Sequence, residues 1–152
     1  MDDPECRVAV ASREVRAPAD RVFELIADPA RQPEWDGNDN LAVAEPGQRV
    51  RAVGDVFGMT LTGGAVRENH VVEFVEDRLI AWKPAEPGRP PVGHLWRWRI
   101  DPIDDDLCIV EHSYDWTDLH DPNRLERARA TMPDRLAASV DRLAALAETA
   151  RG

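Results

Sequence analysis

Apolar and polar residues alternate with the period of an α-helix over residues 133–150. The large apolar side chains share one helical face: Leu136, Val140, Leu143 and Leu146, with Ala147 beside them. The opposite face, which we expect to be solvated, carries Arg135, Ser139, Arg142 and Glu148. Pro133 suits the first helical position, because its missing N–H would be unpaired there anyway. The pattern predicts a long amphipathic helix whose apolar stripe needs a partner.

Residues 6–15 alternate instead with the period of a strand. One face carries Cys6, Val8 and Val10, and the other carries Arg7, Ala9, Ala11 and Arg13. The period then becomes helical from Pro18 and Asp20, which mark a helix start. We expect this helix to bury Val22, Phe23 and Ile26 and to end at Asp28, because a residue before proline avoids the α conformation. Residues 29–35 can add one or two helical turns.

About six further strands are predicted before the long helix. The candidate strands are 41–44, 55–62, 66–75, 78–83, 94–101 and 107–116, with 49–53 either joining the first of these or forming a separate piece. A helical stretch over 121–131 follows. Residues 84–93 hold four prolines and two glycines, which forbids regular pairing. We expect a surface connection there, with a rim or lid over a pocket as the alternative.

Strands joined by short turns pair antiparallel. The element order therefore predicts an α+β architecture, in which a curved antiparallel sheet of about seven strands wraps around the long C-terminal helix and two short helices follow the first strand. Glycines at positions 54, 58, 63 and 64 allow the sheet to curl. With 152 residues, we expect one domain over 1–152 that is large enough for a substantial core.

Several stretches resemble the polyketide cyclase/dehydrase-like branch of the START-like (helix-grip, SRPBCC) superfamily. They are APADRVFELIADPARQPEWDGN at 17–38, GDVFG at 54–58, WRWRID at 96–101 and VEHSYDW at 110–116, followed by the terminal helix. The resemblance covers essentially the whole chain, and its motifs specify the fold rather than a reaction. It implies a seven-stranded sheet gripping the helix, often around an apolar cavity. It implies no particular activity, because this superfamily hosts many.

Composition narrows the classes of partner and compartment. The formal net charge of −10 argues against nucleic acid or anionic membranes as partners. The sequence has neither an apolar run long enough to cross a membrane nor a signal-like start, so we expect a cytoplasmic bacterial protein without membrane insertion. In the helix-grip fold the first and last strands are neighbours, which would place Cys6 and Cys108 near opposite ends of the last strand, too far apart for a disulfide. The oligomeric state stays open, with a dimer among the options.

Aromatic and polar residues on the predicted inward faces are candidates for lining a cavity. We expect the cavity to be lined by Met59, His70, Phe74, Trp82, Trp96, Trp98, His112 and Tyr114 from the sheet, and by Leu136, Val140 and Leu143 from the helix. Trp116 shares the inward face of the last strand. A packed core is the alternative reading of these residues. Trp35 either plugs one end of the sheet or gates the cavity mouth.

Catalytic chemistry has a small set of candidates. His112, on an apolar strand face, is either a hydrogen-bonded core residue or a proton acceptor near neutral pH. Tyr114, His70 and Glu68 are the further candidates for proton transfer beside a carbonyl. No metal or cofactor is expected, because the sequence lacks paired metal-ligand spacings, a phosphate loop and a nucleophile elbow.

Three functions remain open from the sequence. The first is binding of a small hydrophobic or aromatic molecule, such as a lipid or a polyketide-like compound, between the sheet and the C-terminal helix. The second is a polyketide-type cyclase or dehydratase. The third is a protein-interaction domain of the chaperone-activator type. A large closed cavity favours the first, paired ionisable groups with displaced pKa values favour the second, and a filled core with an exposed apolar patch favours the third.

Overall fold

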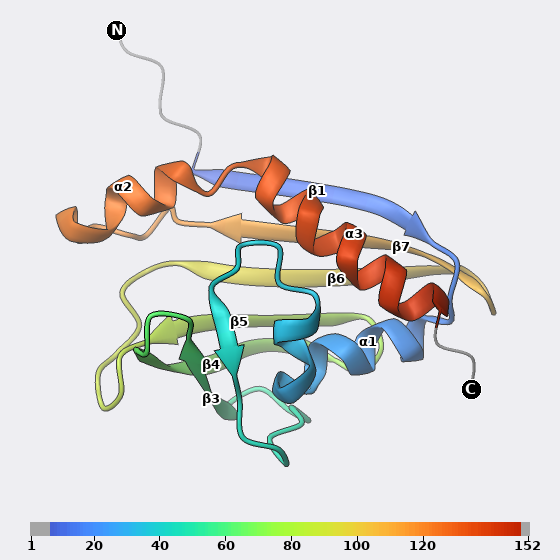
Figure 1. The fold of residues 1–152 in the computed structure, drawn as a ribbon, viewed down its shortest axis with the longest axis horizontal. Coiled ribbons are helices and arrows are strands. Elements are labelled where there is room, and N and C mark those ends of the chain that lie inside the picture. Colours follow the sequence, from blue (N-terminus) through green and yellow to red (C-terminus); the bar gives the residue numbers. More distant parts are fainter. Residues whose placement is uncertain (1–6, 150–152) are drawn as a thin grey trace, which may run out of the picture.

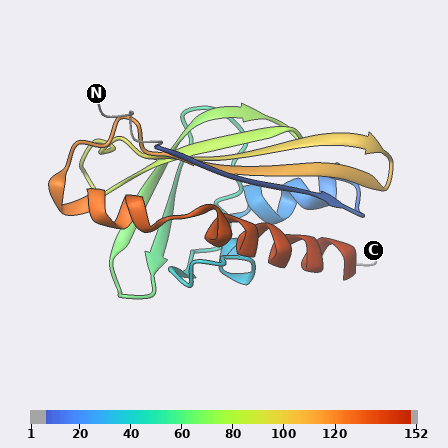
Figure 2. The same ribbon diagram turned by 90° about the horizontal axis from the view of Figure 1, so that it is seen from above.

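A seven-stranded antiparallel sheet with helices on one side forms the fold in the computed structural model, which describes residues 7–149 (Figures 1 and 2). The elements in chain order are β1 (Val8–Val15), α1 (Ala19–Ala27), the 3-10 helix η1 (Pro29–Glu34), β2 (Leu41–Val43), β3 (Val56–Leu61), β4 (Val66–Val75), β5 (Leu79–Ala85), β6 (Leu95–Asp104), β7 (Leu107–Asp115), α2 (Pro122–Ala130) and α3 (Pro133–Thr149). The strand order is β1-β7-β6-β5-β4-β3-β2. The predicted α+β helix-grip architecture is confirmed.

The apolar stripe of α3 lies against the sheet as expected, but its opposite face is not fully solvated. Leu136, Val140 and Leu143 are buried, while Leu146 is half-buried. Ser139, expected in solvent, is only 1% exposed. Its hydroxyl accepts a hydrogen bond from the Gly37 N–H at 2.8 Å. The turn can approach the helix this closely because Gly37 has no side chain, and a Cβ there would lie 2.5 Å from the Ser139 nitrogen.

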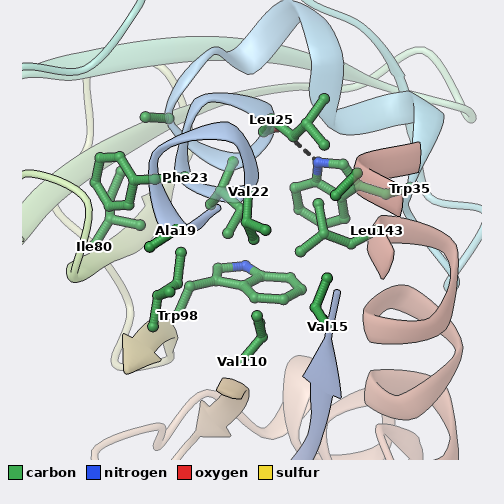
Figure 3. Packing of buried hydrophobic residues seen from close by; sticks show 14 of the residues in the cluster. Val15, Ala19, Val22, Phe23, Leu25, Trp35, Ile80, Trp98, Val110 and Leu143 are labelled. Atoms are coloured by element: carbon green, nitrogen blue, oxygen red, sulfur yellow. Dashed lines mark hydrogen bonds between the residues drawn. The ribbon is translucent and has the colours of Figure 1, made fainter. Parts of the chain in front are cut away.

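The core between α1, α3 and the sheet is filled around Trp98 (Figure 3). This indole is completely buried, and its ring meets that of Trp35 edge to face with centroids 5.0 Å apart. The indole N–H of Trp35 donates to the carbonyl of Leu25 at 2.8 Å, which satisfies a carbonyl near the end of α1. Trp35 is thus packed in the core beneath the sheet, and whether it also gates a cavity stays a prediction.

The sheet curls around the helices, as Figure 2 shows. In β4 the register shifts between Val71 and Glu73, where the strand contains a bulge. Val72 is therefore exposed, while Phe74 turns inward to meet the Phe23 ring at 5.6 Å. Before the bulge the inward positions are Asn69 and Val71. His70 and Phe74, both expected on inward faces, therefore lie on opposite faces of β4, and Glu68 shares the side of His70.

Strands β5 and β6 each extend beyond the predicted end and include a proline. Proline fits there because one edge of the strand has no hydrogen-bonding partner. Pro84 belongs to β5 and lies beyond Trp82, the last residue of β5 that pairs with β6. Pro102 likewise lies in β6, where only β7 is a partner. Residues 49–53 form no strand.

The segment 49–53 is fixed instead by ion pairs and one backbone bond. The guanidinium of Arg49 contacts Glu24 at 2.8 Å and Glu76 at 2.6 Å. The Val50 N–H donates to the Ala27 carbonyl at 2.9 Å. These contacts hold the segment against the end of α1.

The first half of β1 buries a small residue and exposes its two valines. Val8 and Val10 are 42% and 45% exposed, whereas Ala9 is buried beneath the sheet. Ala9 packs with Leu136 of α3, so a small residue there lets the helix approach the strand. Cys6 lies outside the described residues. Cys108 is a free thiol, completely buried opposite Val15.

Candidate functional site

A cavity of about 140 Å³ lies between one end of the sheet, the turn after η1 and helix α2. Six consecutive strands of the sheet, β2 to β7, contribute side chains to its wall. Helix α2 contributes Arg124, Arg127 and Ala128, whereas α3 contributes Ser139 alone. The cavity therefore lies beside the C-terminal helix rather than beneath its apolar stripe.

Six of the residues expected in a cavity line this one. They are Met59, Trp82, Trp96, Trp98, His112 and Tyr114. Inward alternation along β3, β5, β6 and β7 is regular at these positions, so the period of two was sufficient to find them. Their part in binding a ligand stays a prediction.

The other expected residues do not line the cavity. Leu136, Val140 and Leu143 pack in the core against the sheet and α1. Phe74 packs beyond the bulge in β4, outside the cavity wall. His70 and Glu68 lie on the outer side of β4. The Glu68 carboxylate accepts a hydrogen bond from the Gly88 N–H at 2.6 Å, which ties the β5–β6 loop to the sheet.

Two tryptophan rings pack against His112 and Tyr114 in the wall. The His112 imidazole stacks on Trp98 with centroids 3.7 Å apart and on Trp96 at 5.4 Å. The Trp96 indole also meets the Tyr114 ring at 4.3 Å. The Nδ1 atom of His112 lies 3.0 Å from the carbonyl oxygen of Arg97. Since a carbonyl only accepts, Nδ1 carries the proton and Nε2 keeps the lone pair of the neutral ring.

Burial keeps two histidines and the tyrosine of the wall neutral. Burial lowers the pKa of His112 to about 3, against a smaller opposing effect of its bond to the Arg97 carbonyl. Burial also raises the pKa of Tyr114 to about 12. His94, which lies near Tyr114 at 6.0 Å between centroids, has its pKa lowered to about 4 by burial and by nearby arginines. At neutral pH these side chains therefore act as uncharged hydrogen-bonding groups.

The polar side of the cavity was not found from the sequence. The buried carboxylate of Asp36 accepts hydrogen bonds from the backbone N–H groups of Asn38 at 3.0 Å, Asn40 at 2.7 Å and Leu41 at 2.8 Å. It thereby shapes the turn after η1 into one wall. Asp-Gly-Asn chemistry predicted a turn but not its place beside a cavity.

Three arginines are among the other polar residues that line the cavity. They are Arg67, Arg124 and Arg127, and Asn69 and His94 line it as well. The bulge in β4 hides the inward position of Arg67 and Asn69 from a simple alternation. Arg124 and Arg127 come from a short polar helix whose placement depends entirely on tertiary packing. No signal in the sequence pointed to them.

The end of β5 and the loop that follows it lie beside the cavity. Pro84 is part of the cavity wall, and the Glu86 carboxylate contacts the Arg124 guanidinium at 2.8 Å. Gly93 is packed so closely that a Cβ would lie 2.1 Å from the Asp118 carbonyl oxygen. These contacts join the loop to α2 and the preceding segment. Whether the loop opens as a lid stays a prediction.

Within residues 7–149 no group of three histidine, cysteine, aspartate or glutamate side chains is arranged to hold a metal ion. None of the helices in that range is both long and apolar enough to cross a bilayer.

One known protein family matches this chain over nearly its whole length. Residues 7–148 match the family described as polyketide cyclase/dehydrase and lipid transport. The chain belongs to this family. The predicted family resemblance is confirmed.

The curated relatives are longer than this chain. The uncharacterized protein Rv0088 of Mycobacterium tuberculosis is 32% identical over 110 residues, which make up 69% of this chain and 46% of that protein. The chain thus spans about half the length of the curated relatives it matches.

Solved structures share the fold at low sequence identity. The protein XoxI from Bacillus cereus superimposes with a TM-score of 0.68 at 14% identity, covering 95% of this chain and 97% of that one. Norcoclaurine synthase from Thalictrum flavum, in complex with dopamine and hydroxybenzaldehyde, gives a TM-score of 0.61 at 19% identity, covering 95% of this chain and 88% of that one. At such identities the likeness concerns the fold alone.

Proposed function

We propose that this protein binds a small hydrophobic or aromatic molecule in the cavity between the sheet and α2. The observation that carries the proposal is a cavity of about 140 Å³ whose wall combines the rings of Trp82, Trp96 and Tyr114 with many polar and charged side chains. Aromatic surface gives a ligand apolar contact, and convergent polar groups fix its orientation. The family, which includes lipid transport proteins, is compatible with such a role.

The cavity size indicates how much of a ligand it can enclose. Its volume is close to that of an engineered apolar cavity of about 150 Å³ that binds benzene. One aromatic ring, or the end of an alkyl chain, therefore fits inside. Arg127 is both exposed and part of the wall, so the cavity reaches the surface and a longer ligand can extend outward beside α2.

The ionisable groups favour binding over a cyclase or dehydratase reaction. A general base works best with a pKa near the operating pH, and the pKa of about 3 makes His112 a weak proton acceptor. Asp36 is the one carboxylate among the described residues of the wall, and both of its oxygens accept backbone hydrogen bonds. Glu68 lies outside the cavity. The proposal is therefore a binding protein rather than an enzyme.

Native mass spectrometry of the purified protein tests the proposal directly. We expect an adduct of a few hundred daltons that is released by denaturation and can be identified in the extract. A bare protein that also fails to bind any member of a panel of small aromatic and acyl compounds would contradict the proposal.

A matched pair of variants on α2 locates the binding site. Ala128 lines the cavity and is buried, whereas Ala130, two residues further along the helix, is exposed. Ala128→Phe places a ring in the cavity and should abolish the adduct, while Ala130→Phe should retain it. Circular dichroism of both variants checks that the fold is kept. Equal adduct levels in the two folded variants would place the ligand elsewhere.

A further inference from the structure

Positive charge gathers on one side of the cavity of an otherwise acidic protein. The chain has 19 lysine and arginine residues against 29 aspartate and glutamate residues. Three arginines nevertheless line the cavity, namely Arg67 from β4 and Arg124 and Arg127 from α2, and we call them the arginine cluster. The one acidic residue in the described wall is Asp36, whose carboxylate is used by backbone N–H groups. The cavity wall therefore carries a net positive charge.

The arginine cluster is only partly neutralised by protein carboxylates. Arg124 forms ion pairs with Glu86 at 2.8 Å and with Asp121 at 3.4 Å. Arg127 donates to the neutral amide oxygen of Asn40 at 2.8 Å. Arg67 donates to the backbone carbonyl of Val66 at 3.1 Å. Within residues 7–149 neither Arg67 nor Arg127 forms an ion pair, so both have guanidinium N–H groups available for an anion.

The positive charges of the arginine cluster help to lower the pKa values of Arg67 and His94. The pKa of Arg67 is lowered first by burial and then by the charges of Arg124 and Arg127, with Glu86 acting in the opposite direction. The pKa of His94 is lowered by burial and then by all three arginines. A bound anion would relieve this repulsion at a half-buried site, where charges interact more strongly than in water.

Uncharged hydrogen-bonding groups stand beside the arginine cluster. The Nδ1 atom of His94 is buried and has no hydrogen-bond partner within the described part of the chain. Such an atom is costly to leave unpaired. The neutral imidazole can present an N–H on either nitrogen, and the Tyr114 hydroxyl keeps its proton at neutral pH. Both groups can donate to an oxygen anion held by the arginines.

We infer that the arginine cluster binds the carboxylate of an organic acid whose apolar part, about one aromatic ring in size, lies against Trp82, Trp96 and Tyr114. Guanidinium groups suit this anion because their planar fork matches the two oxygens of a carboxylate. The enclosed volume limits the apolar part, and the half-buried arginines let the anionic group keep some water. The inference rests on the proposed binding function and adds the chemical class of its ligand.

Two probes of nearly equal shape test the role of charge. The protein labelled with ¹⁵N is titrated with 3-phenylpropionate and with its uncharged amide, 3-phenylpropanamide, and binding is followed through the indole N–H signals of Trp82 and Trp96. We expect the carboxylate to bind at least about tenfold more tightly than the amide, because charge-assisted hydrogen bonds are about twice as strong as neutral ones. Added NaCl should weaken only the carboxylate.

Matched arginine variants locate the anion. Arg127→Gln removes one charge from an exposed position, and Arg67→Gln removes one from a half-buried position. The control is Arg99→Gln on β6, which removes the same charge from an exposed position outside the cavity. Each cluster variant should weaken the carboxylate about tenfold and leave the amide nearly unchanged, while the control should change neither.

The outcomes separate this inference from the proposed function. Binding of both probes with equal affinity, or equal loss in the control and the cluster variants, would overturn the carboxylate inference and leave the binding function standing. Failure of both probes to shift either indole signal would overturn the carboxylate inference, while the proposed function is decided separately by the native mass spectrum and the compound panel. Selective binding of the carboxylate that is lost in Arg127→Gln but not in Arg99→Gln would establish the inference.

Discussion

The imidazole of His112 lies nearly parallel to the indole of Trp98, with centroids 3.7 Å apart and 14° between the planes. Its Nδ1–H is committed to the carbonyl of Arg97, and only 3% of the residue is exposed. The histidine is therefore an oriented, neutral aromatic group that joins the core to the cavity wall. This arrangement makes the stability of the fold depend on pH.

His112 should destabilise the fold as the pH falls. The folded protein holds its pKa at about 3, below the value of about 6.5 in an unfolded chain. Between these values the unfolded state binds more protons, so the contribution of His112 to stability is complete above about pH 6.5 and is lost toward pH 3. His112→Phe keeps an aromatic ring but cannot titrate. It should lose about 3 kcal/mol less stability than the wild type between about pH 6.5 and 4.

Urea unfolding at several pH values measures this difference. At pH 7 the variant should be less stable than the wild type, because the Arg97 carbonyl loses its donor. The titration of His94 and of the carboxylates is common to both proteins and cancels in the comparison. Parallel stability profiles for wild type and variant would show that His112 does not carry the effect.

Gly37→Ala should be strongly destabilising. Its Cβ would lie 2.5 Å from the Ser139 nitrogen and 2.7 Å from atoms of Ala138, so the turn or α3 must move. Overpacking of this kind costs about 1–3 kcal/mol. Gly63→Ala is the control, because a Cβ at Gly63 meets nothing within 4 Å. Thermal unfolding of both variants measures the difference, and equal melting temperatures would contradict the close contact.

Asp36→Asn should loosen the polar wall of the cavity. The carboxylate accepts three backbone hydrogen bonds, including those from Asn40 and Leu41, and an amide nitrogen in its place cannot accept. Hydrogen bonds to charged groups contribute about 1.5–3 kcal/mol each, so we expect a loss of about 2 kcal/mol. Faster amide exchange should appear at Asn40 and Leu41. Asp105→Asn, at an exposed turn position, serves as the control and should change neither quantity.

Cys108 should be unreactive in the folded protein. It is completely buried, and burial raises the pKa of its thiol to about 11, so little thiolate is present at neutral pH. In a Cys6→Ser variant, iodoacetamide should label Cys108 only as fast as the protein unfolds, and rapidly in urea. Labelling at the rate of a free thiol without denaturant would show that the β1–β7 end of the core opens readily.

The fold was accessible from the sequence because its elements follow regular periods. The apolar stripe containing Leu136 and Leu143 has to be buried on one face of its helix. Trp96 and Trp98 are two residues apart and therefore mark the inward face of β6. Exceptions occur where a local irregularity interrupts the period. The bulge after Val71 reverses which positions of β4 point inward, and no residue type in that strand predicts a bulge.

The candidate site was only half accessible. Its aromatic wall comes from regular strands, but its charged wall depends on where the short helix α2 settles and on which face of β4 carries Arg67. Polar residues are ordinarily assigned to solvent by pattern alone, as Ser139 was. Their position beside a cavity is a tertiary fact that local periodicity does not contain.

The pairing of β1 with β7 has a consequence for how the chain folds. Val8 lies opposite Asp115, so the first strand completes its hydrogen bonds only when a strand about a hundred residues later is in place. Helix α3 then covers both strands. Proteins dominated by such distant contacts fold in milliseconds to seconds rather than microseconds. During synthesis β1 should therefore lack its partner strand until β7 has been made, and its apolar side chains should stay accessible over that time.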